Sequence, residues 1–292
     1  MPGMIWQCRG QSLSLTEPLV MGILNVTPDS FSDGGAHHDP ARAVAHGESL
    51  VADGAALLDI GGESTRPGAT PVPPAEELRR VLPVLERLRD RVRVPLSVDT
   101  RNPEVAAAAL SAGAHIINDV AAHRTDPTLW QHVARHGAGY VAMHMQGLPA
   151  TMQVAPQYRD ILAEMREFFT ERLARLAEHG VTGPQVVLDP GIGFGKNLEH
   201  NLALLRDPCL FAPAGRPILV GVSRKSFLGN LLGVGIEKRL PAGLACTLWA
   251  AQRGVRIFRT HDVAETVQAL RMWTALAAGE DRHPPGVGPG RN

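Results

Sequence analysis

The stretch VMGILNVTPDSFSDGG, residues 20–35, begins as an apolar run and continues as a long polar loop. Its first half, up to Leu24, has the near-continuous apolar composition of a parallel strand that is covered on both faces. Asn25 stands at the junction, and the rest consists largely of Gly, Pro, Asp, Ser and Thr, the residues of turns. Such a loop is too polar to pack as core, and long loops of this kind often close over an active site. The stretch therefore predicts a buried strand that delivers a functional loop.

The same alternation of apolar runs and amphipathic helical patterns continues along the chain. The predicted strands cover 19–26, 57–62, 94–99, 115–120, 140–145, 185–190, 217–223 and 255–262. The predicted helices cover 40–53, 74–90, 103–112, 127–136, 158–179, 198–206, 239–253 and 264–278. Eight strands alternating strictly with eight helices predict an α/β fold, a single-domain (β/α)₈ TIM barrel over residues 19–278. A doubly wound open sheet is the alternative.

Composition limits the class of protein. Lysine plus arginine and aspartate plus glutamate each number 29, so the net charge is zero and nothing indicates a nucleic-acid-binding protein. The N-terminal segment, residues 1–18, does not have the pattern of a signal peptide, and no stretch approaches 18 apolar residues. Three scattered cysteines without a CxxC pair favour a reducing compartment, so we expect a cytoplasmic protein without a membrane partner. The glycine- and proline-rich tail, residues 279–292, is predicted to be disordered.

Every predicted strand ends in polar residues or in a glycine-rich loop. Because a barrel presents the carboxyl ends of its strands at one mouth, we expect these groups to gather there. They are Asn25, GGESTRPGA (61–69), Asp99, Asn118 with Asp119, Met143 with His144 and Gln146, DPGIGFGK (189–196), SRKSFLG (223–229) and Arg259 with His261. One polar strand end is usually a helix cap or a turn, but eight together indicate a single active site.

A cationic set is predicted on one side of this mouth. Arg66 follows the second strand, and Arg259 and His261 follow the eighth, and both strands adjoin the first in a closed barrel. Paired arginines suit the bidentate geometry of phosphate oxygens, although any one of them could instead form a surface ion pair. Asn25 could ligate Mg²⁺ through its carbonyl while phosphate oxygens and water complete the coordination shell, or it could simply cap a helix or turn.

An acidic set is predicted on the other side. Asp99 and Asp189 follow the third and sixth strands, and Asn118 follows the fourth. Carboxylates at a barrel mouth can accept two parallel N–H bonds from an amidine-like edge, such as that of a pterin or guanine. Lys225 could bond a ring carbonyl or nitrogen, and Met143 offers a polarizable face. A lone aspartate is more often an N-cap or an ion-pair partner.

Other chemistries fit these residues less well. Two carboxylates in a barrel also suggest a glycosidase, but aromatic residues, which stack on sugars, make up only 4% of the chain, and the cationic set would have no role. The stretch GIGFGKN (191–197) is not a P-loop, because Pro190 and Asn197 stand where glycine and serine or threonine are required. Ser223 lacks the GxSxG context of a hydrolase nucleophile.

Together these motifs resemble those of a known family. The stretches are MGILNVTPDSFSDGG, DIGGESTRPGA, SVDT, INDV, MHMQGLPATMQ, LDPGIGFGKN, GVSRKSFLG and RTHDV, in this order. They are similar to the motifs of the dihydropteroate synthases, the sulfonamide targets of folate biosynthesis. The resemblance implies a barrel that condenses 6-hydroxymethyl-7,8-dihydropterin pyrophosphate with p-aminobenzoate, giving 7,8-dihydropteroate and pyrophosphate. It also implies a homodimer that uses Mg²⁺ and small-molecule substrates.

The resemblance further implies roles for single residues. Those implied to bind the pterin are Asp99, Asn118, Met143, Asp189 and Lys225. Those implied to hold the pyrophosphate are Asn25, Arg66, Arg259 and His261, with Mg²⁺ on Asn25. Those implied to shape the p-aminobenzoate pocket are Thr65, Pro67, Phe194 and Ser226. The catalytic residues would be Asn25, Arg66, Lys225, Arg259 and His261, and the loop 26–39 would close over the leaving group as a lid.

Three alternatives stay open. A pterin-binding methyltransferase barrel would have no use for the cationic set or for the loop after Asn25. A catalytically silent pterin-binding paralogue should lack some of the implied catalytic residues, and none is missing. A non-enzymatic scaffold would leave the polar strand ends unexplained. No general base or covalent nucleophile stands out, so we expect catalysis by positioning and electrostatics.

Overall fold

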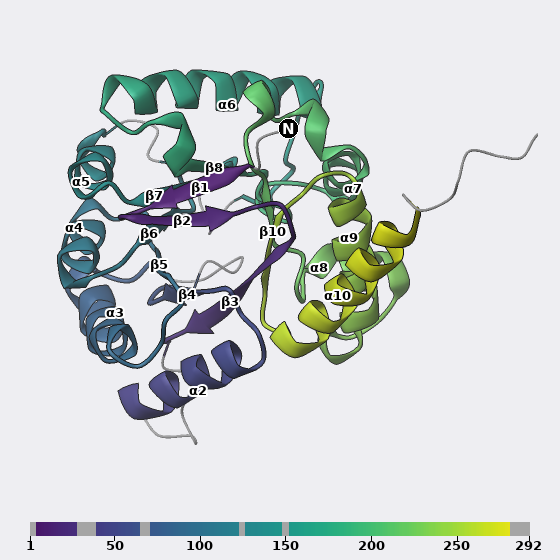
Figure 1. Ribbon diagram of the computed structural model, residues 1–292. Coiled ribbons are helices and arrows are strands. Elements are labelled where there is room, and N and C mark those ends of the chain that lie inside the picture. The colour runs from purple at the N-terminus through teal and green to yellow at the C-terminus, as the bar shows by residue number, and fades with distance from the viewer. Residues whose placement is uncertain (1–3, 28–38, 65–70, 123–125, 148–151, 281–292) are drawn as a thin grey trace, which may run out of the picture.

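Eight parallel strands form the centre of the computed structural model, which describes residues 4–27, 39–64, 71–122, 126–147 and 152–280 (Figure 1). Their order in the sheet is β8-β7-β6-β5-β4-β3-β10-β9. Their bounds are β3 (Leu19–Asn25), β4 (Leu57–Gly61), β5 (Leu96–Asp99), β6 (Ile116–Asp119), β7 (Gly139–Met143), β8 (Val186–Asp189), β9 (Leu219–Val220) and β10 (Ile257–Thr260). A parallel bridge between Leu188 and Ile218 joins the two ends of the sheet. The predicted barrel is therefore confirmed, and the open sheet is wrong.

Helices cover the outside of the barrel between successive strands (Figure 1). They are α2 (Pro40–Ala52), α3 (Pro74–Arg89), α4 (Pro103–Ala112), α5 (Thr128–His136), α6 (Ile161–Glu178), α7 (Leu198–Arg206), α9 (Leu240–Gln252) and α10 (Val263–Glu280). A further short helix, α8 (Ser226–Leu232), follows β9 where the sequence predicts a loop. In the described part of the chain, none of the helices is both long enough and apolar enough to cross a membrane.

The helical period of α3 shows how the sequence forms this outer layer. Val81, Val84, Leu85 and Leu88 are buried against the barrel, as expected for one apolar face of an amphipathic helix. Elements end where backbone chemistry requires it. The helices α4 and α5 stop at Gly113 and Gly137, both in the left-handed conformation that lacks a steric cost only for glycine.

A hairpin at the N-terminus closes the floor of the barrel. Strands β1 (Ile5–Cys8) and β2 (Gln11–Ser14) pair antiparallel, and Trp6 and Cys8 alternate inward while their neighbours stay exposed. Trp6 packs in one apolar cluster with residues of the barrel strands, and its Nε1 donates to the carbonyl oxygen of Gln185 at 2.7 Å. The sequence assigns residues 1–18 no element, because two strands of four residues are too short for their period to stand out.

Candidate active site

The strand register aligns the predicted residues in layers at the carboxyl mouth. Asn25 lies opposite Gly61, Gly61 opposite Asp99, and Asp99 opposite Asn118. An added Cβ at Gly61 would lie 3.6 Å from both Asn25 Oδ1 and the Asp99 Cβ, so the Asn25 amide oxygen faces the same gap as Asp99. Residues that are far apart in the sequence thus meet at one level of the barrel.

The centre of this layer is a carboxylate that the sequence analysis missed. Asp59, in the middle of β4, is fully buried and accepts three hydrogen bonds. Arg259 Nε donates to it at 2.6 Å, Asn118 Nδ2 at 2.8 Å and Ser97 Oγ at 2.6 Å. In the sequence Asp59 is a lone acidic residue inside an apolar strand, whereas the predicted site residues all stand at strand ends or in loops.

Arg259 connects the two predicted sets instead of belonging to the cationic one alone. Besides Asp59, its guanidinium pairs through Nη2 with Asp99 Oδ2 at 2.8 Å. Burial raises the pKa of Asp99 to about 8, and the nearby Arg259 only partly opposes this while the charge of Asp59 adds to it. The acidic and cationic halves of the mouth therefore share one network of buried charges.

Asn118 carries a buried acceptor near the carboxyl end of β6. Its Nδ2 must face Asp59, because an ionised carboxylate can only accept hydrogen bonds. This orientation turns Oδ1 the other way, and that buried oxygen has no hydrogen-bond partner among the described residues. An unpaired buried acceptor costs free energy, which a ligand N–H would recover.

Asp189 and Lys225 lie close enough for the charge of each to influence the pKa of the other. Asp189 Oδ1 accepts from the backbone N–H of Gly191 at 2.7 Å, and burial raises the pKa of this carboxyl. Desolvation lowers the pKa of Lys225 to about 8, with the charge of Arg259 acting in the same direction. Lys225 Nζ lies 3.9 Å from the centre of the Phe194 ring, a cation–π contact that brings the predicted pterin and p-aminobenzoate residues together.

An apolar wall lies beside these groups. Met143 is buried and packs with Val120, Met145 and Met152, and Phe194 packs against this cluster. The loop that carries Phe194 is held by Lys196, another buried residue that the sequence analysis did not assign. Lys196 Nζ donates to the Phe194 carbonyl oxygen at 2.9 Å and contacts His144 Nδ1 at 3.1 Å.

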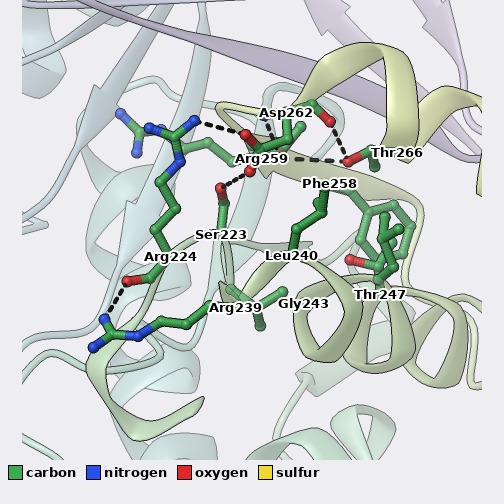
Figure 2. A pocket seen from close by; sticks show the side chains of 13 residues that line it. Ser223, Arg224, Arg239, Leu240, Gly243, Thr247, Phe258, Arg259, Asp262 and Thr266 are labelled. Atoms are coloured by element: carbon green, nitrogen blue, oxygen red, sulfur yellow. Dashed lines mark hydrogen bonds and ion pairs between the residues drawn. The ribbon is translucent and has the colours of Figure 1, made fainter. Parts of the chain in front are cut away.

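His261 lies on the cationic side with a hydroxyl at its ring. Its Nδ1 is 3.0 Å from Ser223 Oγ, which belongs to the loop after β9. This loop, the end of β10 and α9 border a pocket whose lining includes Ser223, Arg224, Arg239 and Leu240 (Figure 2). Ser226, predicted to contact p-aminobenzoate, is exposed at the first position of α8.

Three predicted site residues, Thr65, Arg66 and Pro67, lie outside the described residues. The same is true of residues 28–38, most of the predicted lid. Beside Gly62, at the start of the loop after β4, lies another carboxyl that the sequence analysis did not identify. Glu77 of α3 is buried, its Oε1 has no partner among the described residues, and burial raises its pKa to about 7.

Comparison with known proteins gives one consistent result. The chain matches the family described as pterin binding enzyme over residues 21–261. It is 49% identical over 275 residues to the dihydropteroate synthase of Escherichia coli strain K12, covering 94% of this chain and 97% of the relative. A structure of Xanthomonas albilineans dihydropteroate synthase with 4-aminobenzoic acid is 48% identical, with a TM-score of 0.88 over 94% of this chain and 99% of that chain. A structure of the enzyme from Xanthomonas albilineans in complex with 7,8-dihydropteroate is 45% identical, with a TM-score of 0.84 over the same shares.

Proposed function

The chain belongs to the pterin-binding enzyme family, among the dihydropteroate synthases, and from this premise we propose how its barrel mouth performs the reaction. The enzyme joins 6-hydroxymethyl-7,8-dihydropterin pyrophosphate to p-aminobenzoate, which gives 7,8-dihydropteroate and releases pyrophosphate. The expectation from the sequence motifs is thereby confirmed over a methyltransferase barrel and a non-enzymatic scaffold.

The pterin binds in the acidic half of the mouth. The observation that carries this assignment is Asn118 Oδ1, a buried acceptor that lies away from Asp59 and lacks a partner among the described residues. The amino-pyrimidine edge of a pterin supplies N–H donors for Asn118, Asp189 and Asp99. Burial is the main cause of the raised pKa of both aspartates, because it removes the water that would stabilise their charge. The N–H donors of a bound pterin would replace that water and stabilise the carboxylate forms. Met143 lies against the ring and Lys225 donates to it.

The pyrophosphate binds in the cationic half, on Asn25, Arg66, Arg259 and His261. Of these residues, Asn25 would hold Mg²⁺, because its amide oxygen faces the gap it shares with Asp99, and Mg²⁺ prefers a few protein oxygens together with phosphate oxygens and water. When bound, the ion neutralises charge on the leaving group. Arg259 keeps its guanidinium oriented through Asp59, so its position is set before substrate arrives.

Catalysis follows from charge placement. As pyrophosphate leaves, negative charge grows on it and positive charge grows on the pterin methylene, where the ring delocalises it. Arg66, Arg259 and His261 stabilise the first charge, and the carboxylates of Asp99 and Asp189 stabilise the second. The aniline nitrogen of p-aminobenzoate attacks the pterin methylene from a pocket shaped by Thr65, Pro67, Phe194 and Ser226. Lys225 joins these pockets through its contact with Phe194.

One assay tests this assignment. Pyrophosphate release from the pterin pyrophosphate is measured with and without p-aminobenzoate and with and without Mg²⁺. We expect sustained release only when both are present, with 7,8-dihydropteroate formed in equal amount. Pterin binding without any release would instead indicate the catalytically silent paralogue.

A second copy of the chain is the proposed partner. Large apolar side chains are exposed on the neighbouring helices α8, α9 and α10, which lie on one side of the barrel (Figure 1). They are Leu231, Leu232, Trp249, Met272 and Leu276. Exposed apolar side chains of this kind suit an association surface, and a homodimer formed through these helices would bury them. Light scattering of Met272→Glu, expected to give monomers where the parent gives dimers, tests the placement.

The location and the domain limits are also proposals. Cys8, Cys209 and Cys246 are free thiols, which suits the reducing cytoplasm. One catalytic unit spans residues 19–278, to which the N-terminal hairpin is added as a floor. Deleting residues 1–15 should expose the barrel floor and lower thermal stability while the residues of the mouth stay in place.

A further inference from the structure

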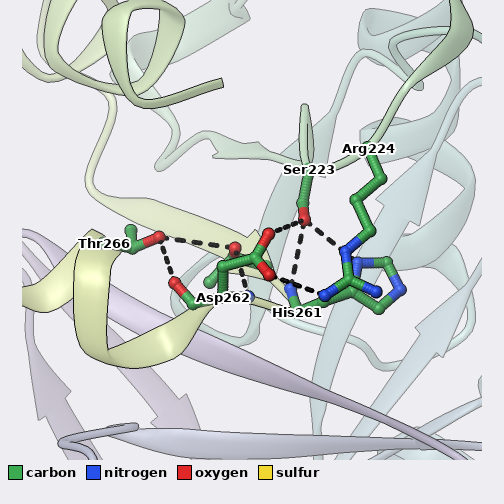
Figure 3. Close-up of polar contacts among 6 residues, drawn as sticks. Ser223, Arg224, His261, Asp262 and Thr266 are labelled. Atoms are coloured by element: carbon green, nitrogen blue, oxygen red, sulfur yellow. Dashed lines mark hydrogen bonds and ion pairs between the residues drawn. The ribbon is translucent and has the colours of Figure 1, made fainter. Parts of the chain in front are cut away.

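Ser223 and Asp262, which have no role in the function described above, form a polar cluster with His261. The hydroxyl oxygen of Ser223 lies 3.0 Å from His261 Nδ1, 3.2 Å from the His261 backbone nitrogen and 3.3 Å from Asp262 Oδ2 (Figure 3). The three contacts join the loop after β9 to the segment between β10 and α10. The Ser223 hydroxyl therefore bridges the imidazole of His261 and the carboxylate of Asp262.

Counting protons limits the arrangement. A serine hydroxyl has one proton to donate and two lone pairs that accept. The His261 backbone N–H must use one lone pair, and the Asp262 carboxylate can only accept. When Ser223 donates to Asp262, its second lone pair is left for a proton on His261 Nδ1. In that state Nδ1 is a donor, and the ring geometry turns Nε2 away from the serine.

Asp262 is held in place to receive the serine proton. Arg224 Nη2 donates to its Oδ1 at 2.6 Å, so the second oxygen faces Ser223. Thr266 Oγ1 donates to the Asp262 carbonyl at 2.7 Å, and Arg239 Nη1 donates to the Arg224 carbonyl at 3.0 Å. Arg224 thus holds the carboxylate itself, while Thr266 and Arg239 fix the backbone of Asp262 and of Arg224.

The order of the groups differs from that of a hydrolase triad. In such a triad the imidazole stands between serine and aspartate and activates the serine. Here the serine stands between the imidazole and Asp262, so the hydroxyl relays the influence of the carboxylate onto His261. Ser223 is accordingly suited to orient a histidine and poorly suited to act as a nucleophile.

We propose that Ser223, backed by Asp262, is a positioning residue that holds His261 with Nδ1 donating to the serine and Nε2 turned toward the pyrophosphate. This inference rests on the proposed function, in which His261 binds that anion. With Nδ1 protonated, His261 can donate to a phosphate oxygen only as the imidazolium, which carries a second proton on Nε2. Ser223 and Asp262 therefore adapt His261 to a negatively charged leaving group.

Two variants separate orientation from folding. Ser223→Ala removes the hydroxyl, and we expect about tenfold weaker binding of free pyrophosphate by calorimetry, the size of one hydrogen bond. Ser223→Thr keeps the hydroxyl and should restore the affinity. Affinity for a pterin without phosphates should be unchanged in both variants. The matched control is Ser111→Ala, whose hydroxyl lies on the exposed side of α4, and it should bind pyrophosphate and the pterin as the parent does.

Asp262→Asn is the sharper variant because it reverses the hydrogen bond. The asparagine oxygen stays on Arg224, so its NH₂ faces Ser223 and the serine must then donate to His261 Nδ1. Nitrogen-15 spectra of the pyrophosphate complex, with the His261 signals assigned from His261→Gln, should show both ring nitrogens protonated in the parent and Nδ1 unprotonated in Asp262→Asn.

The outcomes distinguish this inference from the proposed function. Unchanged pyrophosphate affinity in Ser223→Ala, or identical His261 spectra in the parent and Asp262→Asn, would overturn the positioning role. If His261→Gln itself bound pyrophosphate normally, the role of His261 in the proposed function would be wrong as well. Loss of pterin affinity along with pyrophosphate affinity in Ser223→Ala would mark a structural defect and also contradict the inference.

Discussion

Asp59→Asn would remove one buried charge while keeping the hydrogen bonds of the central network. The asparagine oxygen can take the place of Oδ2 and accept from Arg259 Nε and Asn118 Nδ2. Its NH₂ group then replaces Oδ1 and donates to Ser97 Oγ, which can accept as readily as it donates. Asp59→Ala, by contrast, leaves all three neighbours without this partner.

The magnitudes of the two variants should differ. A pair of unit charges whose centres lie about 4 Å apart contributes roughly 4 kcal/mol at an effective dielectric constant of about 20, and desolvating the carboxylate costs a similar amount. The terms largely cancel, so we expect Asp59→Asn to change the free energy of unfolding by no more than about 1–2 kcal/mol. Removing one partner from a buried charged network costs about 3–5 kcal/mol, which is our expectation for Asp59→Ala.

Asp59→Asn should also change the pH at which Asp99 titrates. The charge of Asp59 contributes to raising the pKa of Asp99 to about 8, so Asp59→Asn lowers that pKa. The carboxylate form of Asp99, which the proposed contact with the pterin requires, then persists to lower pH. Pterin affinity measured by calorimetry between about pH 6 and pH 9 should keep its strength to lower pH in the variant than in the parent.

Urea unfolding and calorimetry together provide the test, with Asp90→Asn on the exposed end of α3 as the matched control. Equal unfolding free energies for Asp59→Asn and Asp59→Ala would refute the argument that hydrogen bonds to Asp59 hold the network. An unshifted pH profile of pterin binding in Asp59→Asn would refute the electrostatic link to Asp99.

Three further predictions concern single residues. Burial raises the pKa of Glu77 to about 7, so the folded state favours the protonated side chain. The stability that this protonated side chain contributes is complete below the pKa of Glu77 in the unfolded chain and is lost as the pH rises through 7. Glu77→Gln should therefore match the parent in urea unfolding near pH 4 and be more stable near pH 8.5, by at most about 3 kcal/mol; a constant difference across this range would contradict the shift. Asp189→Ala should weaken pterin binding by about 2–4 kcal/mol by calorimetry, because ligand donors stay unpaired, and an unchanged affinity would exclude the pterin assignment. Phe194→Leu should raise the KM for p-aminobenzoate about tenfold through loss of the aromatic contact and leave pterin affinity unaltered, whereas equal losses for both substrates would contradict a pocket for p-aminobenzoate.

The barrel could be predicted because its signal is repeated. Each apolar run is covered on both faces, so the run itself marks the strand, and the polar residue that ends it marks the mouth. Asn25, Asp99, Asn118 and Asp189 were found in this way, and the strand register brings the first three into one layer. The length of β9 was overestimated, since only Leu219 and Val220 pair with β10.

The rest depends on contacts that a local pattern does not contain. Asp59 carries its meaning only through Ser97, Asn118 and Arg259, which are separated from it by 38, 59 and 200 positions. Lys196 is one of three lysines in the chain, and its role in holding the loop of Phe194 appears only once the carbonyl oxygens around it are known. A residue that positions another is recognised by its hydrogen-bond partners, and these partners can be identified only once the fold is known.

The position of Arg259 explains why the two halves of the mouth act together in the proposed mechanism. Its guanidinium has five N–H donors, and contacts to Asp59 and Asp99 use two of them. The remaining donors leave capacity for phosphate oxygens without breaking either ion pair. A pterin that bonds to Asp99 and a pyrophosphate that bonds to Arg259 are then linked through one salt bridge of 2.8 Å. In the proposed mechanism, the charge that separates as the pyrophosphate leaves is then aligned with this ion pair, positive toward the carboxylate and negative toward the guanidinium. Such alignment costs no reorganisation at the moment of reaction, which is where electrostatic catalysis gains most.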